Sequence, residues 1–150
     1  DPRVMEHFVA PLTREQSDAT LARVREGIDR RGWGWWLLER RSDGAFAGFT
    51  GLSPVREEFP MAPAVEVGWR LPVHAWDAGY ATEAARAAIA FAFETLRLRE
   101  TVSFTATSNA RSMAVMQRLG MAPDGTFEHP AVPEGHRIRT HVLYRLRNGD

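Results

Sequence analysis

Residues 65–96 carry the pattern that most constrains the fold: a short apolar segment, a loop and a long alanine-rich helix. Val65–Leu71 is typical of a strand, and Gly68 inside it indicates a bulge or the close approach of another backbone or a ligand. Gly79–Leu96 has apolar residues at helical spacing. They are Ala81, Ala84, Ala85, Ala88, Ile89, Ala92, Phe93 and Leu96. Because most of these side chains are methyl groups, this helix can pack very close to a sheet.

Helical and extended patterns alternate along the rest of the chain. Thr13–Gln16 matches a capping box and predicts a helix over residues 14–30 that Gly32 ends. A shorter helix is expected from Asp1 through about Phe8. Ser42-Asp43-Gly44 predicts the turn of a β-hairpin. Strands are expected at residues 35–40, 46–52, 65–71, 102–106, 122–128 and 137–147, with a further helix at 109–119. This order predicts a mixed α/β fold around one sheet.

The composition indicates one domain, residues 1–150, with 44% hydrophobic residues. The formal net charge of zero argues against nucleic-acid binding and against electrostatic docking to a membrane. The absence of cysteine excludes disulfides and a thiolate nucleophile. No apolar run reaches the length of a membrane span, so we expect a cytoplasmic protein. All 19 basic residues are arginine, which favours a bacterial, GC-rich source.

Small residues surround the start of the long helix, at Trp76-Asp-Ala-Gly-Tyr-Ala-Thr82. A helix N-terminus has free backbone N–H groups and the positive end of the helix dipole. Small residues there allow a phosphate to approach those groups closely. The pattern therefore predicts an anion site, although an ordinary strand–turn–helix without a ligand has the same pattern.

The same segment resembles motif A of the GNAT superfamily of N-acetyltransferases, Q/R-x-x-G-x-G/A. It is most similar to the RimJ/RimL-like branch (ribosomal-protein-alanine acetyltransferase-like), in which W-G-x-G-Y-A-T-E-A is the typical string. This chain has W-D-A-G-Y-A-T-E-A. Val65-Glu-Val-Gly-Trp-Arg-Leu71 and Asn109-Ala-Arg-Ser112 followed by Arg-Leu-Gly120 also match the branch. The resemblance covers nearly the whole chain.

The resemblance implies the GNAT fold, a mixed, mostly antiparallel central sheet that splays at the cofactor site, with helices on both faces. The opening residues read as the middle of a segment, so we expect part of an N-terminal strand and helix of that fold to be missing from the sequence.

The resemblance also implies acetyl-CoA as co-substrate, with its pyrophosphate on the motif A backbone and its pantetheine arm along the splayed strand. Asn109 matches a position that contacts the arm. The implied cofactor residues are Trp69, Arg70, Leu71, Trp76, Ala78, Gly79, Tyr80, Ala81, Thr82, Asn109 and Ser112.

Asp77 departs from the family pattern, which usually has glycine there. A carboxylate beside a pyrophosphate repels it unless the carboxylate points to solvent. Asp77 also stands where the backbone conformation can be one that glycine adopts easily. We therefore expect reduced cofactor affinity.

The implied reaction is direct acetyl transfer to a primary amine, which needs a base and a donor for the leaving thiolate. The resemblance suggests Ser112 as donor; its alternative role is in an Asn-x-x-Ser helix cap. Tyr144 is a second donor candidate, or a buried strand tyrosine. Glu66 is a candidate base, or a paired or solvent-facing carboxylate. His129 and His136 are candidate acceptor-binding residues, with an ordinary surface position as the alternative.

The five histidines lack metal-ligand spacing, so we expect no metal. We expect the acceptor to be a protein N-terminus or a small amine. The sequence allows either a monomer or a homodimer. A non-catalytic acyl-CoA-binding domain and a plain interaction domain on the same fold are the alternatives.

Overall fold

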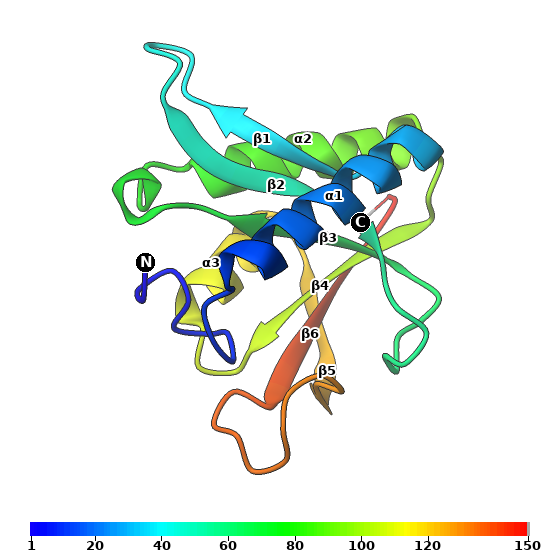
Figure 1. Cartoon of the computed structure of the whole chain (residues 1–150). Helices are drawn as coiled ribbons and strands as arrows, with labels where there is room; N and C mark the ends of the chain where they lie inside the picture. Colours follow the sequence, from blue (N-terminus) through cyan, green and yellow to red (C-terminus); the bar gives the residue numbers. More distant parts are fainter. Residues whose placement is uncertain (150) are drawn as a thin grey trace.

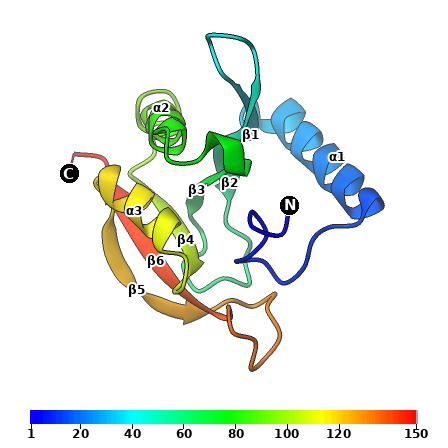
Figure 2. The same cartoon turned by 90° about the vertical axis from the view of Figure 1, so that its left-hand side faces the viewer.

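The computed structural model describes residues 1–149. They form one six-stranded sheet with helices on both of its faces (Figure 1). The strand order is β1-β2-β3-β4-β6-β5. The elements are α1 (Arg14–Arg31), β1 (Trp35–Glu39), β2 (Phe46–Pro54), β3 (Val65–Arg70), the short 3-10 helix η1 (Val73–Ala75), α2 (Tyr80–Glu94), β4 (Glu100–Ala106), α3 (Ala110–Arg118), β5 (Ala122–Glu128) and β6 (Thr140–Arg147). Figure 2 shows α2 and α3 on one side of the sheet and α1 on the other.

The mixed α/β prediction is confirmed, and so are the hairpin and the α1 capping box. The Thr13 side chain accepts from the Gln16 N–H, while the Gln16 side chain accepts from the Thr13 N–H. The predicted helix at Asp1–Phe8 is wrong. Residues 2–10 form turns and bends, because Val4 and Met5 both donate to the Asp1 carbonyl and the pattern does not propagate.

The sheet divides between β3 and β4. Every other neighbouring pair is antiparallel, whereas β3 and β4 are parallel and share a single register pair, Glu66 with Val102. Beyond Glu66 the two strands diverge, which leaves the β4-facing edge of β3 without a strand partner.

The main core lies between the sheet and α2. Ala85, Ala88 and Ala92 are buried there against Leu52 and Val67. The methyl side chains let α2 approach the sheet closely, as the alanine stripe predicts. This packing fixes where the N-terminus of α2 points.

Two expectations about strands need correction. Gly68 forms no bulge, since β2 and β3 pair without a register shift; a Cβ there would lie 2.5 Å from the Trp35 ring, which covers it. The strand predicted at 137–147 starts at Thr140 and is buried on both faces rather than one, since His141 and Leu143 are buried on one face and Tyr144 and Leu146 on the other. Among the α1 side chains, Leu21 is 46% exposed, so the stripe that it shares with Val24 and Ile28 is only partly covered.

Candidate active site

The turn between β3 and α2 (residues 72–79, here the α2 turn) exposes the start of the helix. The first helical hydrogen bond runs from Glu83 N–H to the Gly79 carbonyl at 3.0 Å. The N–H groups of residues 80–82 therefore lack a partner within the helix, and no side chain caps it. Gly79 adopts φ 83°, and a Cβ on it would meet no atom within 4 Å. The turn thus presents free donors to open space.

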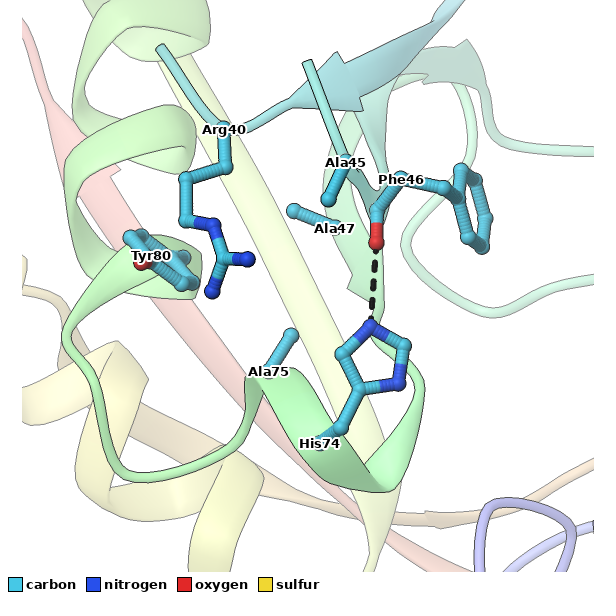
Figure 3. A pocket seen from close by; sticks show the side chains of 7 residues that line it. All are labelled: Arg40, Ala45, Phe46, Ala47, His74, Ala75 and Tyr80. Carbon is cyan, nitrogen blue, oxygen red and sulfur yellow. Dashed lines mark hydrogen bonds between the residues drawn. The ribbon is translucent and has the colours of Figure 1, made fainter. Parts of the chain in front are cut away.

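Two side-chain hydrogen bonds hold the α2 turn against the sheet. His74 donates from Nε2 to the Phe46 carbonyl at 3.1 Å (Figure 3), and Trp76 donates from Nε1 to the Leu71 carbonyl at 2.9 Å. Figure 3 also shows the Arg40 side chain directed toward the Tyr80 ring. The cavity between the hairpin tip, His74 and Tyr80 is about 10 Å³, room for about one water molecule. The hairpin tip therefore supports the turn and forms no ligand site there.

An open groove of about 650 Å³ lies in front of the exposed helix start. Most of its lining residues are charged or hydroxyl-bearing, and they include two arginines without an ion pair among residues 1–149. The lining residues are Asp77, Gly79, Thr82, Glu83, Arg86 and Arg118. The groove's size, its backbone donors and its cations fit a phosphate-bearing ligand.

Asp77 has φ 57°, the left-handed conformation that glycine adopts easily, as expected for a position where the family has glycine. Its carboxylate is not left alone in solvent. Arg111 Nη1 lies 2.9 Å from both carboxylate oxygens, and its guanidinium lies over the Trp76 ring, 4.7 Å from the centroid. Sequence reasoning misses Arg111; its only signal is a cation beside the Asn109–Ser112 motif.

The divergence of β3 and β4 leaves backbone groups unpaired on β3, the strand that leads into the α2 turn. Leu52 donates its N–H to the Gly34 carbonyl, so the backbone groups of Leu52 face β1. Backbone groups alternate along paired strands, so those of Gly51 face Gly68. The next residue on β3, Trp69, therefore turns its N–H and C=O toward β4, where no strand pairs with them. An extended ligand can pair with this edge.

Asn109 and Ser112 lie together at the start of α3. The Asn109 carboxamide accepts from Ser112 N–H at 3.2 Å and donates to Thr105 Oγ1 at 2.8 Å and to Ser112 Oγ at 3.2 Å. This arrangement is the Asn-x-x-Ser helix cap, the alternative to a catalytic role for Ser112. It leaves the Ser112 hydroxyl accepting from Asn109, so its own hydrogen is free to donate.

Glu66 lies at the point where β3 and β4 part. Burial raises the pKa of its carboxyl to about 7. Within the described chain, no side chain forms a hydrogen bond or ion pair with it. A carboxyl with this pKa exchanges protons near neutrality, as a general base must.

Tyr144 is 4% exposed within the main core, and its hydroxyl lies 3.5 Å from Gln117 Nε2. This burial favours the structural role of a strand tyrosine over a role as donor.

Both candidate acceptor histidines have structural tasks in the β5–β6 connection. His129 Nδ1 accepts from Ala131 N–H at 3.2 Å, and His136 Nδ1 accepts from Ile138 N–H at 3.4 Å. His129 is partly buried against the ring of His141, 4.6 Å between centroids. Burial, with the nearby charge of His141, lowers the pKa of His129 to about 4, and burial also lowers the pKa of His141.

His129 and His141 belong to an aromatic–histidine cluster that the sequence does not predict. Ring contacts with centroids 4.6–6.5 Å apart join its five members, which come from four segments of the chain. The members are Phe59, Phe104, Phe127, His129 and His141. The cluster covers the sheet face opposite α2 and α3, next to β4.

Across residues 1–149 no group of three or more side chains has an arrangement suited to holding a metal ion. Over the same range, no helix combines the length and apolar character needed to cross a bilayer.

This chain is similar to known proteins in sequence and in fold. A family model described as "Acetyltransferase (GNAT) domain" matches residues 1–122. A curated relative, the FsC-acetyl coenzyme A-N(2)-transacetylase of Aspergillus fumigatus, is 35% identical over 90% of this chain. The chain spans 62% of that relative's length.

Solved structures share the fold. An acetyltransferase from Agrobacterium tumefaciens has a TM-score of 0.76 and 27% identity, covering 99% of this chain and 80% of its own. A ribosomal-protein-S5-alanine acetyltransferase from Vibrio fischeri has a TM-score of 0.75 and 19% identity, covering 99% and 85% of the two chains. At that identity the second likeness concerns the fold alone.

Proposed function

The chain belongs to the GNAT acetyltransferase domain family, and from this premise we propose that it transfers an acetyl group from acetyl-CoA to a primary amine. One observation carries the proposal: the open helix start at Gly79 faces a groove, and β3, the strand that leads into this turn, has an unpaired edge. A GNAT domain needs such a site for a phosphate-bearing thioester. We propose residues 1–150 as one such domain.

The chain's own groups fit acetyl-CoA in two parts. The N–H groups of residues 80–82 are placed to bind its pyrophosphate, with Arg86 and Arg118 as cations in the same groove. The exposed N–H and C=O of Trp69 are placed to pair with the amide groups of the pantetheine arm, as a neighbouring strand would. The proposed contacts therefore rest mainly on backbone groups.

In the proposed reaction the amine nitrogen attacks the thioester carbonyl carbon, the C–S bond breaks and the amine loses a proton. Glu66, with its pKa raised by burial to about 7, takes that proton directly or through water. Ser112 donates its hydroxyl hydrogen toward the departing sulfur while Asn109 holds its oxygen. No covalent enzyme intermediate is needed.

The acceptor class rests on the relatives. The Aspergillus relative is named as an N(2)-transacetylase. We propose that the acceptor is an amine. It is a protein N-terminus if the chain acts like the RimJ/RimL-like branch, and a small molecule otherwise. The Val65–Leu71 and Asn109–Gly120 motifs support this branch.

Calorimetric titration with acetyl-CoA, followed by CoA release with a panel of amines, tests the proposal. We expect micromolar binding, about −8 kcal/mol, and turnover with at least one amine. In wild type, kcat/KM should rise with pH through an apparent pKa near 7, and Glu66→Gln should abolish that rise. Ser112→Ala should lower kcat with little change in affinity.

Binding without turnover on any amine would instead support the acyl-CoA-binding domain. Absence of binding at millimolar acetyl-CoA would overturn the proposed function.

A further inference from the structure

The Asp77–Arg111 ion pair lies at the groove, because Asp77 is one of the residues that line it. Asp77 lines the groove beside Gly79, and Arg111 reaches it from the first turn of α3. Both side chains are exposed, 61% for Arg111 and 79% for Asp77. An ion pair this exposed contributes at most about 1 kcal/mol, so its partners can separate at low cost.

Arg111 is held within reach of the groove by a second contact. Its guanidinium lies 4.7 Å from the centroid of the Trp76 ring, and Trp76 is fixed by its hydrogen bond to the Leu71 carbonyl. Stacking on an indole does not depend on Asp77. The guanidinium can therefore change its anionic partner without leaving its place.

A phosphate is the better partner for that guanidinium. The pyrophosphate of acetyl-CoA carries two negative charges where the carboxylate carries one, and its oxygens match the planar donor fork of arginine. If Arg111 stayed paired with Asp77, it would reduce the repulsion between the carboxylate and the phosphate. It would form no hydrogen bond with the phosphate itself.

We propose that Arg111 raises the affinity of the groove for the phosphate groups of acetyl-CoA, by exchanging the Asp77 carboxylate for a phosphate oxygen when the cofactor binds. Asp77 is thus a competitor built into the site. This inference rests on the proposed function, since it requires acetyl-CoA to bind in the groove.

A double-mutant cycle separates this role from simple neutralisation. The four proteins are wild type, Asp77→Asn, Arg111→Gln and the double variant, each titrated with acetyl-CoA by calorimetry. Asparagine matches the size of aspartate and tolerates the left-handed backbone. Arg14→Gln, which removes another exposed, ion-paired arginine, controls for net charge.

We expect Asp77→Asn to tighten binding by up to about fivefold and Arg111→Gln to weaken it by about tenfold. Arg111→Gln should also weaken binding by about tenfold or more when Asp77 is already asparagine. Arg14→Gln should leave the dissociation constant unchanged.

An unchanged dissociation constant for Arg111→Gln in the Asp77→Asn background would overturn the inference, because Arg111 would then act only on Asp77. The proposed function would survive that result. A wild-type chain that binds no acetyl-CoA at millimolar concentration would overturn both.

Discussion

The α2 turn and the aromatic–histidine cluster lie on opposite faces of one sheet and are built in opposite ways. The α2 turn offers backbone donors, a glycine with φ 83° and open space in front of them. The cluster is made of side chains that touch one another, with Phe59 only 6% exposed. The turn leaves room for a ligand, whereas the side chains of the cluster pack against one another. Substitutions should therefore separate binding at the first from stability at the second.

The largest expected effect is on stability at the cluster. Phe59→Ala removes a buried ring that contacts Phe104, Phe127 and His129, so the free energy of unfolding should fall by about 3 kcal/mol or more. Urea unfolding measures this change. The matched control is Phe49→Ala, whose ring is 39% exposed and should cost much less. Equal losses for both variants would show that the cluster is not a packing centre.

The next effect is on binding at the α2 turn. Gly79→Glu places a carboxylate in the groove and strains a left-handed position, so affinity for acetyl-CoA should fall by about 100-fold. Calorimetry measures the affinity. Gly135→Glu, at a left-handed glycine with φ 75° in the β5–β6 connection, pays the same backbone strain away from the groove. Affinity lost equally in the two variants would attribute the effect to strain alone.

Low pH should destabilise the fold through the aromatic–histidine cluster. The folded-state pKa of His129 is about 4, below its ordinary value of 6.5, so the unfolded chain binds more protons between these pH values. The free energy of unfolding is at its highest above pH 6.5 and decreases as the pH falls toward 4. The slope due to His129 is about 1.4 kcal/mol per pH unit. Unfolding midpoints across this range should fall less steeply for His129→Gln, and parallel curves would contradict the assignment.

The smallest effect tests the support of the α2 turn. His74→Ala removes the hydrogen bond to the Phe46 carbonyl, worth about 1 kcal/mol. The turn should become less fixed, and acetyl-CoA affinity should fall by about fivefold. A change in unfolding free energy without any change in affinity would show that this bond serves the fold alone.

The two regions also differ in what the sequence predicts. The α2 turn follows from neighbouring residues, because the alanine stripe, Gly79 and the motif around it act over a few positions. The same local logic predicts that Asp77 adopts a glycine-like conformation. The cluster brings together side chains from the 55–64 loop, β4, β5 and β6, and no local pattern connects Phe59 with His141.

Arg111 shows the same limit at the site. Its contact with Asp77 depends on how α3 is placed against the α2 turn, which is a property of the tertiary structure. Gly68 shows it too, because the ring that covers it belongs to Trp35 on another strand. The Asp1–Phe8 prediction is wrong because a favourable first turn does not guarantee propagation.

The single register pair between β3 and β4 makes this sheet two half-sheets joined by a weak seam. A ligand that pairs with the free edge of β3 acts as a strand across that seam. At a concentration 100 times its dissociation constant it would add about 2.7 kcal/mol to stability. Hydrogen exchange of amides in both halves should then slow together, because acetyl-CoA would make one cooperative folding unit out of two.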